Sequence, residues 1–176
     1  INGSLRFNDD DNAYLSWTPA SAGDQRTWTW SAWVKRGNIN TTQMLFESRP
    51  PIADNDRTFI VLHSNTSVNL EVTDISGGGH VWDLRTTQVF RDPSAWYHIV
   101  VQHDTTQATS SDRIKIYVNG KRITAFNTAT YPSLNYQSDV NAALPHTIGD
   151  SATAYSANFD GYLADVYFID GQALSA

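Results

Sequence analysis

The amino-acid sequence predicts an all-β fold, a two-sheet antiparallel β-sandwich of the jelly-roll type. Apolar and polar residues alternate in many short runs, which is the pattern of strands with one buried face. Segments rich in Asn, Asp, Ser, Thr and Pro separate these runs, and no helical periodicity extends beyond about two turns. The chain has 176 residues and no repeat, linker or low-complexity tract, so we expect residues 1–176 to form a single domain.

The first half of the chain contains five predicted strands, of which residues 27–35 alternate most strictly. The face expected to point into the core carries Trp28, Trp30, Ala32 and Val34. The face expected to point outward carries Thr29, Ser31, Trp33 and Lys35. Three further strands are predicted at residues 44–47, 58–62 and 68–72. A turn of three glycines at residues 77–79 leads into the fifth strand, residues 80–86.

The second half adds strand patterns at residues 96–103, 113–123 and 159–169. The clearest is 113–123, where Ile114, Ile116 and Val118 alternate with polar residues. It contains Asn119-Gly120, the preferred pair for a two-residue type I′ turn, so we expect a β-hairpin here. The last pattern is interrupted only by Gly161. The segments 48–57, 105–112 and 127–145 are predicted loops.

Composition excludes several classes of function. Twelve Lys and Arg face eighteen Asp and Glu, for a net charge of −6, and no basic run is present. This argues against a nucleic-acid partner and against a polybasic membrane patch. No apolar stretch approaches the ~20 residues of a membrane span, so we expect no membrane insertion. The absence of cysteine excludes disulfides, thiolate metal sites and Cys nucleophiles. Because the chain begins with Ile1, we expect it to be excised from a longer protein.

Six short motifs, in order along the chain, carry a resemblance to a known family. They are Ser4–Asn8 with Tyr14-Leu15, Trp28–Lys35, Trp96–Val101, Ile116–Lys121, Ile148-Gly149 and Phe159–Leu163. In this order they resemble a laminin G-like domain of the concanavalin A-like lectin and glucanase superfamily. The amino-acid sequences of Arg6–Asp10 and Phe168–Leu174 are also similar to those of modules in virion or tail proteins of marine bacteriophages.

The resemblance implies two curved antiparallel sheets, often with calcium at one edge and a carbohydrate on a face or loop rim. As calcium ligands it implies Asn8 and Asp10 in the first turn, together with Asp165 near the last strand. Calcium takes six to eight oxygen ligands, which this Asx-rich turn could supply in part. Ala164 stands where the family usually has its acidic ligand, and a shift of one residue turns a side chain to the other face. A solvated turn without an ion is the alternative.

The sequence does not contain the motifs of the superfamily's enzymes. Its glucanases use Glu-x-Asp-x-x-Glu, whereas Glu47 is isolated here and Glu71 lies three positions before Asp74. An odd spacing places two strand residues on opposite faces, so Glu71 and Asp74 should not form a catalytic pair. The Arg-x-Glu-x-Arg and Gln-x-His strands of jelly-roll polysaccharide lyases do not occur either. We therefore expect a protein that is not an enzyme.

An outward sheet face is one candidate site for glycan binding. A sugar ring stacks its C–H face on Trp or Tyr while planar polar groups hold its hydroxyls. The alternation turns Trp33 outward, and it also turns out His98, Lys115 and Tyr117 on the neighbouring predicted strands. Four of the five other tryptophans are expected in the core: Trp28, Trp30, Trp82 and Trp96. The alternative is that a loop covers Trp33.

The loop rim is the rival location, since recognition often sits on loops. Tyr131 and Tyr136 lie in one polar loop, Tyr155 lies in another, and Arg49 stands before Pro50-Pro51. Tyrosines in a Ser- and Asn-rich loop are adaptable contact residues. Ordinary loop packing is the alternative for all four.

The sequence thus favours a non-catalytic, lectin-like carbohydrate-binding module. Its expected partners are a glycan or polysaccharide and the other domains of a multidomain parent. Its expected place is extracellular or on a virion surface, where it would serve glycan recognition or host attachment. Two alternatives stay open: a structural or adhesion domain that binds protein and no sugar, and an enzyme with an unrecognised site.

Overall fold

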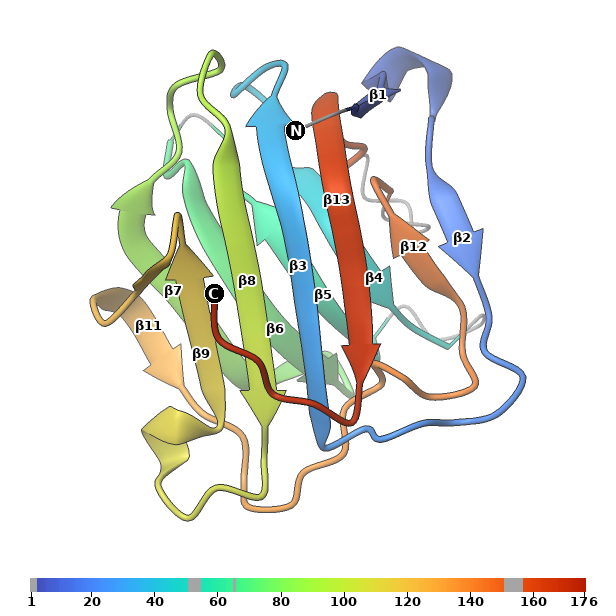
Figure 1. Ribbon diagram of the computed structural model, residues 1–176, viewed down its shortest axis with the longest axis vertical. Coiled ribbons are helices and arrows are strands. Elements are labelled where there is room, and N and C mark those ends of the chain that lie inside the picture. The colour runs from blue at the N-terminus through green and yellow to red at the C-terminus, as the bar shows by residue number, and fades with distance from the viewer. Residues whose placement is uncertain (1–2, 51–54, 65, 151–156) are drawn as a thin grey trace.

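The structure, a computed structural model, describes residues 3–50, 55–64, 66–150 and 157–176 and confirms the two-sheet antiparallel sandwich (Figure 1). The six-stranded sheet contains, in spatial order, β1 (Leu5–Phe7), β13 (Gly161–Asp170), β3 (Thr27–Arg36), β8 (Tyr97–Asp104), β9 (Ile114–Val118) and β10 (Lys121–Arg122). The seven-stranded sheet contains β11 (Phe126–Thr130), β7 (Gly79–Val89), β6 (Asn69–Ser76), β5 (Arg57–Leu62), β4 (Gln43–Ser48), β12 (His146–Ile148) and β2 (Leu15–Trp17). Two short 3-10 turns, η1 (Asp9–Asp11) and η2 (Ser110–Asp112), are the helical elements among these residues.

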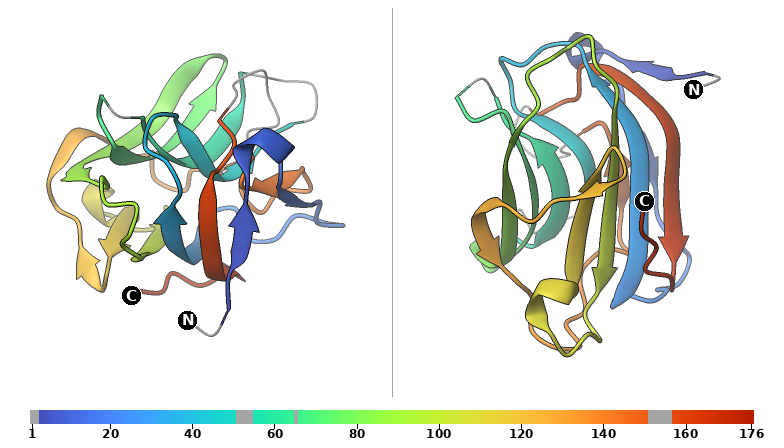
Figure 2. Two further views of the ribbon diagram at one scale, coloured as in Figure 1. Left: turned by 90° about the horizontal axis from the view of Figure 1, so that it is seen from above. Right: turned by 60° about the vertical axis from the view of Figure 1, so that its left-hand side comes forward.

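The sheets form two layers (Figure 2), and the alternation of each strand decides which side chains lie between them. Trp28, Trp30 and Trp82 are fully buried there, as expected. Trp96, expected in the core, is only half-buried because it lies before the first residue of β8. Trp28 and Trp30 come from β3, and the seven-stranded sheet, which supplies Trp82, opposes them with the side chains of Phe46, Ile60, Leu62, Leu70, Val72 and Leu84.

The predicted hairpin is confirmed. Lys121 pairs with Val118, and the two residues between them, Asn119 and Gly120, have φ values of +50° and +78°. Positive φ at both central positions is the requirement of a type I′ turn, and Asn and Gly are the residues that tolerate it.

Two strand boundaries differ from the sequence prediction. Gly161 does not interrupt the last strand but begins it, with a φ of +150°. A Cβ at this position would lie 2.2 Å from the Lys35 carbonyl oxygen, so the backbones of β13 and β3 can approach this closely only at glycine. The predicted loop 127–145 is in part a strand, because β11 extends to Thr130 and pairs with β7.

The C-terminal segment returns over the outer face of the six-stranded sheet (Figure 1). The Leu174 amide donates a hydrogen bond to Thr29 Oγ1 at 2.8 Å, and this hydroxyl donates to the Gln172 carbonyl at 2.7 Å. Thr29 is consequently buried although it lies on the outward face of β3. Among the described residues, no helix has the length and apolar character needed to cross a lipid bilayer.

Candidate functional site

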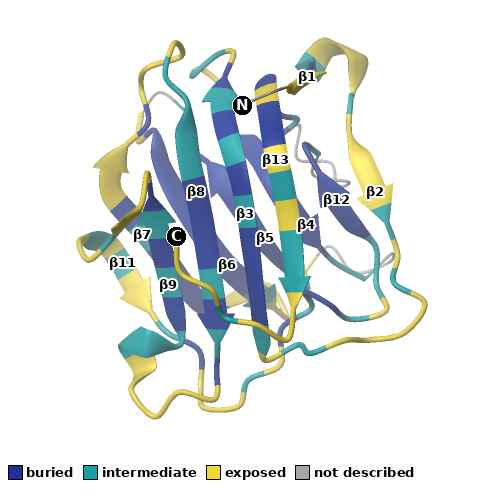
Figure 3. Cartoon of the chain, viewed as in Figure 1, coloured by how far each residue is buried: buried dark blue, intermediate teal, exposed yellow. Residues whose placement is uncertain are grey.

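The outer face of the seven-stranded sheet carries an unusual set of side chains. Strands β4 and β5 are buried at every residue and β6 at its first six, although only one face of each strand points into the sandwich (Figure 3). The register aligns Val61, Glu71 and Arg85 in one row across β5, β6 and β7. The next row consists of Phe59, Thr73 and Asp83. Buried charged groups therefore stand beside buried apolar groups on a face that points away from the core.

Three of these side chains, together with His63 just after β5, form what we call the charged cluster: His63, Glu71, Asp83 and Arg85. The Glu71 carboxylate accepts hydrogen bonds from Arg85 Nη2, at 2.9 Å, and from His63 Nε2. Arg85 Nη2 also lies 3.8 Å from Asp83 Oδ2. The sequence did not reveal this cluster, because its members come from different strands and only the register brings them together.

Environment separates the pKa values of the two carboxyl groups of the cluster. Burial by itself would raise the pKa of Glu71, but the hydrogen bond from His63 and the charge of Arg85 outweigh it and hold this pKa below its usual value. Burial, aided by the nearby negative charge of Glu71, raises the pKa of Asp83. Glu71 is therefore the carboxylate of the pair that retains its charge most strongly.

A hollow of about 140 Å³ adjoins the charged cluster. Its floor is an apolar group separate from the main core, made of Met44, Phe59, Val61 and Ala157. Its border carries the polar residues Thr42, Arg57, His63 and Glu71. The Arg57 guanidinium lies 5.1 Å from the centre of the Phe59 ring and 3.6 Å from a Glu47 carboxylate oxygen. The hollow thus offers an apolar base with hydrogen-bonding groups at its edge.

The residues predicted for the sheet-face site lie together on the outer face of the six-stranded sheet. Trp33 pairs with His98 across β3 and β8, and their rings stack at 4.9 Å. Tyr117 donates a hydrogen bond to Gln102 Oε1 at 3.2 Å, and Lys115 lies 3.3 Å from Asp112. All four predicted residues are half-buried. The structure brings these four side chains together, and their role in sugar binding is untested.

The residues predicted for the loop rim are spread over different environments. Tyr131 and Tyr136 pack against the main core, and the Tyr136 hydroxyl donates to Asp74 Oδ1 at 2.8 Å. Arg49 directly follows β4, and its side chain lies 3.6 Å from the carboxylate of Glu47 in that strand. Tyr155 lies outside the described residues. The Tyr136 hydroxyl is thus used for a hydrogen bond inside the fold.

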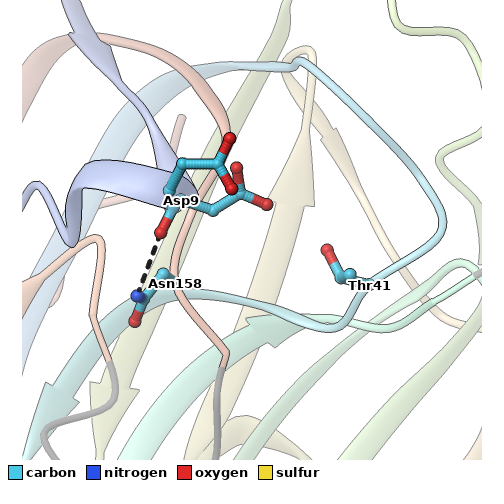
Figure 4. A pocket seen from close by; sticks show the side chains of 4 residues that line it. Asp9, Thr41 and Asn158 are labelled. Atoms are coloured by element: carbon cyan, nitrogen blue, oxygen red, sulfur yellow. Dashed lines mark hydrogen bonds between the residues drawn. The ribbon is translucent and has the colours of Figure 1, made fainter.

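The residues predicted to bind calcium are not brought together. Asn8 donates to Asp11 at 2.8 Å, and Asp10 lines a hollow with Asp9, Thr41 and Asn158 (Figure 4). Phe7 pairs with Gly161 and Leu5 with Leu163, which places Asp165 roughly 15 Å along β13 from this turn. Asn8, Asp10 and Asp165 therefore do not fit a single calcium ion.

The carboxylate that does reach the first turn is Asp160. It is already engaged by Arg6, at 2.7 Å, and by the Asn38 amide, at 3.2 Å. The Asn38 amide also lies 3.4 Å from Asp9 Oδ2. The acidic side chains at this edge are thus linked to one another by cationic and amide groups of the chain itself.

The comparison with protein families agrees with this architecture. A family model described as the concanavalin A-like lectin/glucanases superfamily matches residues 9–176. The chain belongs to this superfamily. No curated protein matches the chain in sequence.

Several solved structures share this fold. A SAP-like pentraxin from Limulus polyphemus superposes with a TM-score of 0.65 and 16% identity over 99% of this chain and 74% of its own. The CBM40 module of a Ruminococcus gnavus sialidase, bound to α2,3-sialyllactose, gives 0.62 and 14% over 93% and 94%. Domain 4 of a Geobacillus stearothermophilus extracellular arabinanase, in complex with arabinotriose, gives 0.58 and 18% over 88% of this chain and 64% of that one. At such identities the likeness is one of fold.

Proposed function

We propose that this concanavalin A-like domain is a non-catalytic carbohydrate-binding module. The observation that carries the proposal is the hollow on the outer face of the seven-stranded sheet. Its apolar floor can receive the C–H face of a sugar, and the more exposed polar groups at its border, Thr42 and His63, can exchange hydrogen bonds with the hydroxyls. Its volume equals the liquid-state share of roughly five water molecules, so it suits one sugar ring.

The comparisons support this proposal at the level of fold. Two of the similar structures were determined with an oligosaccharide bound, namely sialyllactose and arabinotriose. Binding is also the simplest use of a rigid sheet face whose side chains are held by the register of three strands. We extend the proposal to a module of a larger secreted or surface protein, such as a virion protein, that attaches to host glycans.

Binding is favoured over hydrolysis by the state of the carboxyl groups. Glu71 and Asp83 have oxygens within 4.8 Å of each other, which is near the ~5 Å carboxyl separation of retaining glycosidases. Their side chains are only 3% and 10% exposed, however, and Glu71 is bonded to both His63 and Arg85. A catalytic acid and nucleophile must both touch the glycosidic bond, and this pair is covered.

A single site of this size predicts modest affinity. We expect dissociation constants of roughly micromolar to millimolar, because one sugar ring offers few buried contacts. Useful attachment would then come from several copies that bind one glycan surface together, which raises the effective affinity without new contacts.

The second candidate function is protein binding at an open edge of the sandwich. A hollow of about 460 Å³ there is lined largely by apolar residues, including Leu5, Leu15, Ile148, Leu163 and Val166. Leu5 and Leu15 are 55% and 46% exposed, on the short edge strands β1 and β2. Exposed apolar side chains on an edge favour contact with another chain or domain.

Substitution on each sheet face tests which surface binds sugar. We expect the wild-type domain to bind at least one class on an array of algal, bacterial and animal glycans. His63→Ala should weaken that binding at least tenfold, since it removes a hydrogen-bonding group at the border of the hollow. Trp33→Ala should leave it within about twofold, as should the matched histidine control His98→Ala.

The array has two contradicting outcomes. If Trp33→Ala and His98→Ala abolish binding while His63→Ala does not, the site lies on the six-stranded sheet. If no glycan binds the wild-type domain, the carbohydrate proposal is wrong and the apolar edge becomes the leading surface.

A further inference from the structure

We propose that the domain binds one divalent transition-metal ion of the zinc type on the outer face of the seven-stranded sheet, between Glu71, His80 and Asp83. This site is distinct from the calcium site that the resemblance implied, and it does not depend on sugar binding. One ligand atom from each of the three residues lies within 4.8 Å of the others. An imidazole nitrogen with two carboxylate oxygens is a donor set that zinc accepts.

Hydrogen bonding prepares His80 as a ligand. Thr73 Oγ1 has one proton, which it donates to the Trp82 carbonyl at 2.7 Å. The same oxygen lies 2.8 Å from His80 Nδ1, so it must accept there and Nδ1 must carry the ring proton. This fixes the tautomer of the neutral ring and leaves the Nε2 lone pair available. Protein metal sites orient their histidine ligands by such a bond on the other ring nitrogen.

One carboxylate oxygen of Asp83 is buried without an N–H donor, and the polar neighbour of this carboxyl group in the charged cluster is the Glu71 carboxyl. The Asp83 side chain is 10% exposed, and its Oδ1 atom is fully buried without a hydrogen-bond partner among the described residues. A buried acceptor left without a partner costs about 1–3 kcal/mol, and more when it is charged. A bound cation at this point would satisfy it.

Arg85 is the competitor for the same position. Its guanidinium contacts Glu71 at 2.9 Å and lies 3.8 Å from Asp83. His63 and Arg85 both donate to Glu71, but Arg85 stays 3.8 Å from Asp83, so the position between the two carboxylates lacks a close cation that a divalent ion could supply. The Arg85 side chain is 34% exposed, so it has a route to solvent when the ion enters. The ion would thus replace Arg85 between the carboxylates and gain His80 as a third ligand.

Titration with zinc chloride alone tests the site. We expect isothermal calorimetry to show one ion per chain, with a matching rise in thermal unfolding temperature. His80→Ala and Asp83→Asn should each weaken binding at least tenfold, and the matched control His98→Ala should not. Histidine side-chain NMR should show the His80 ring signals moving on zinc addition while those of His98 stay in place. Calcium should bind far more weakly, because it takes oxygen ligands.

Arg85→Gln gives an independent readout that does not rely on losing binding. Removing the competing cation should tighten zinc binding several-fold. Absence of zinc binding by the wild-type domain, equal affinity in His80→Ala, or weaker binding in Arg85→Gln would each overturn the proposal. Glycan binding by the same samples is measured separately, so failure of one site leaves the other standing.

Discussion

Replacing Trp28 by Ala should lower the free energy of unfolding by about 3–5 kcal/mol. The indole is fully buried between the sheets and stacks on His103, with ring centroids 4.6 Å apart. Its Nε1 donates to Ser138 Oγ at 3.2 Å, so truncation removes a hydrogen bond as well as the packing of a large ring. Urea unfolding followed by circular dichroism measures the difference.

Trp33→Ala is the matched control for this prediction. It removes the same side chain from the same strand, but from the half-buried outer face, where we expect a cost of about 1 kcal/mol. Equal losses for the two variants would contradict the division of β3 into a core face and an outer face.

The sandwich could be predicted from sequence because its signals are local. Alternation in residues 27–35 decides which side chains enter the core, and Asn119-Gly120 defines its turn without help from distant residues. Gly161 shows the limit of such signals. Position 161 must be glycine because the Lys35 carbonyl oxygen of another strand approaches it closely. The sequence of residues 159–169 alone does not distinguish this requirement from an interruption of the strand.

The candidate site could be predicted only in part, because it depends on pairing between strands. The prediction that Glu71 and Asp74 point to opposite faces agrees with the structure, where Asp74 bonds to Thr58 and Tyr136. The partner of Glu71 is instead Arg85, opposite it on the next strand. A bulge shifts the pairing between Asp74 and Ile75, so counting residues outward from the turn does not give this register.

The dependence on strand register also explains which acidic residue of the last strand region lies near the first turn. Residue spacing allows Asp165 to face the turn, but the pairing of Phe7 with Gly161 brings Asp160 there instead. A side chain's distance from another strand is fixed by register, and register becomes visible only when both strands are placed.

Asp74→Asn should stabilise the domain by about 1–3 kcal/mol at pH 7 and by almost nothing at pH 4. Burial raises the pKa of Asp74 from 3.8 to about 6, against the opposing hydrogen bonds from Thr58 and Tyr136. The folded state therefore holds this proton more tightly than the unfolded chain does. The stability that the proton contributes is lost as pH rises from about 4 to 6. Asn is neutral at every pH and can still bond both hydroxyls.

His103 has the opposite linkage, which is why the difference between variant and wild type must be followed. Burial lowers the pKa of His103 from 6.5 to about 4, although the Arg26 carbonyl favours the charged ring. Its unfolded state takes up the proton first, so stability falls as pH decreases from 6.5 to 4. In the wild type, acidification from pH 6 to 4 adds stability through Asp74 and removes stability through His103, so the two changes offset each other. In Asp74→Asn only the loss through His103 remains, and the free energy of unfolding should decline steeply on acidification. Urea unfolding from pH 4 to 8 measures both curves, and a constant difference between them would show that Asp74 does not titrate in this range.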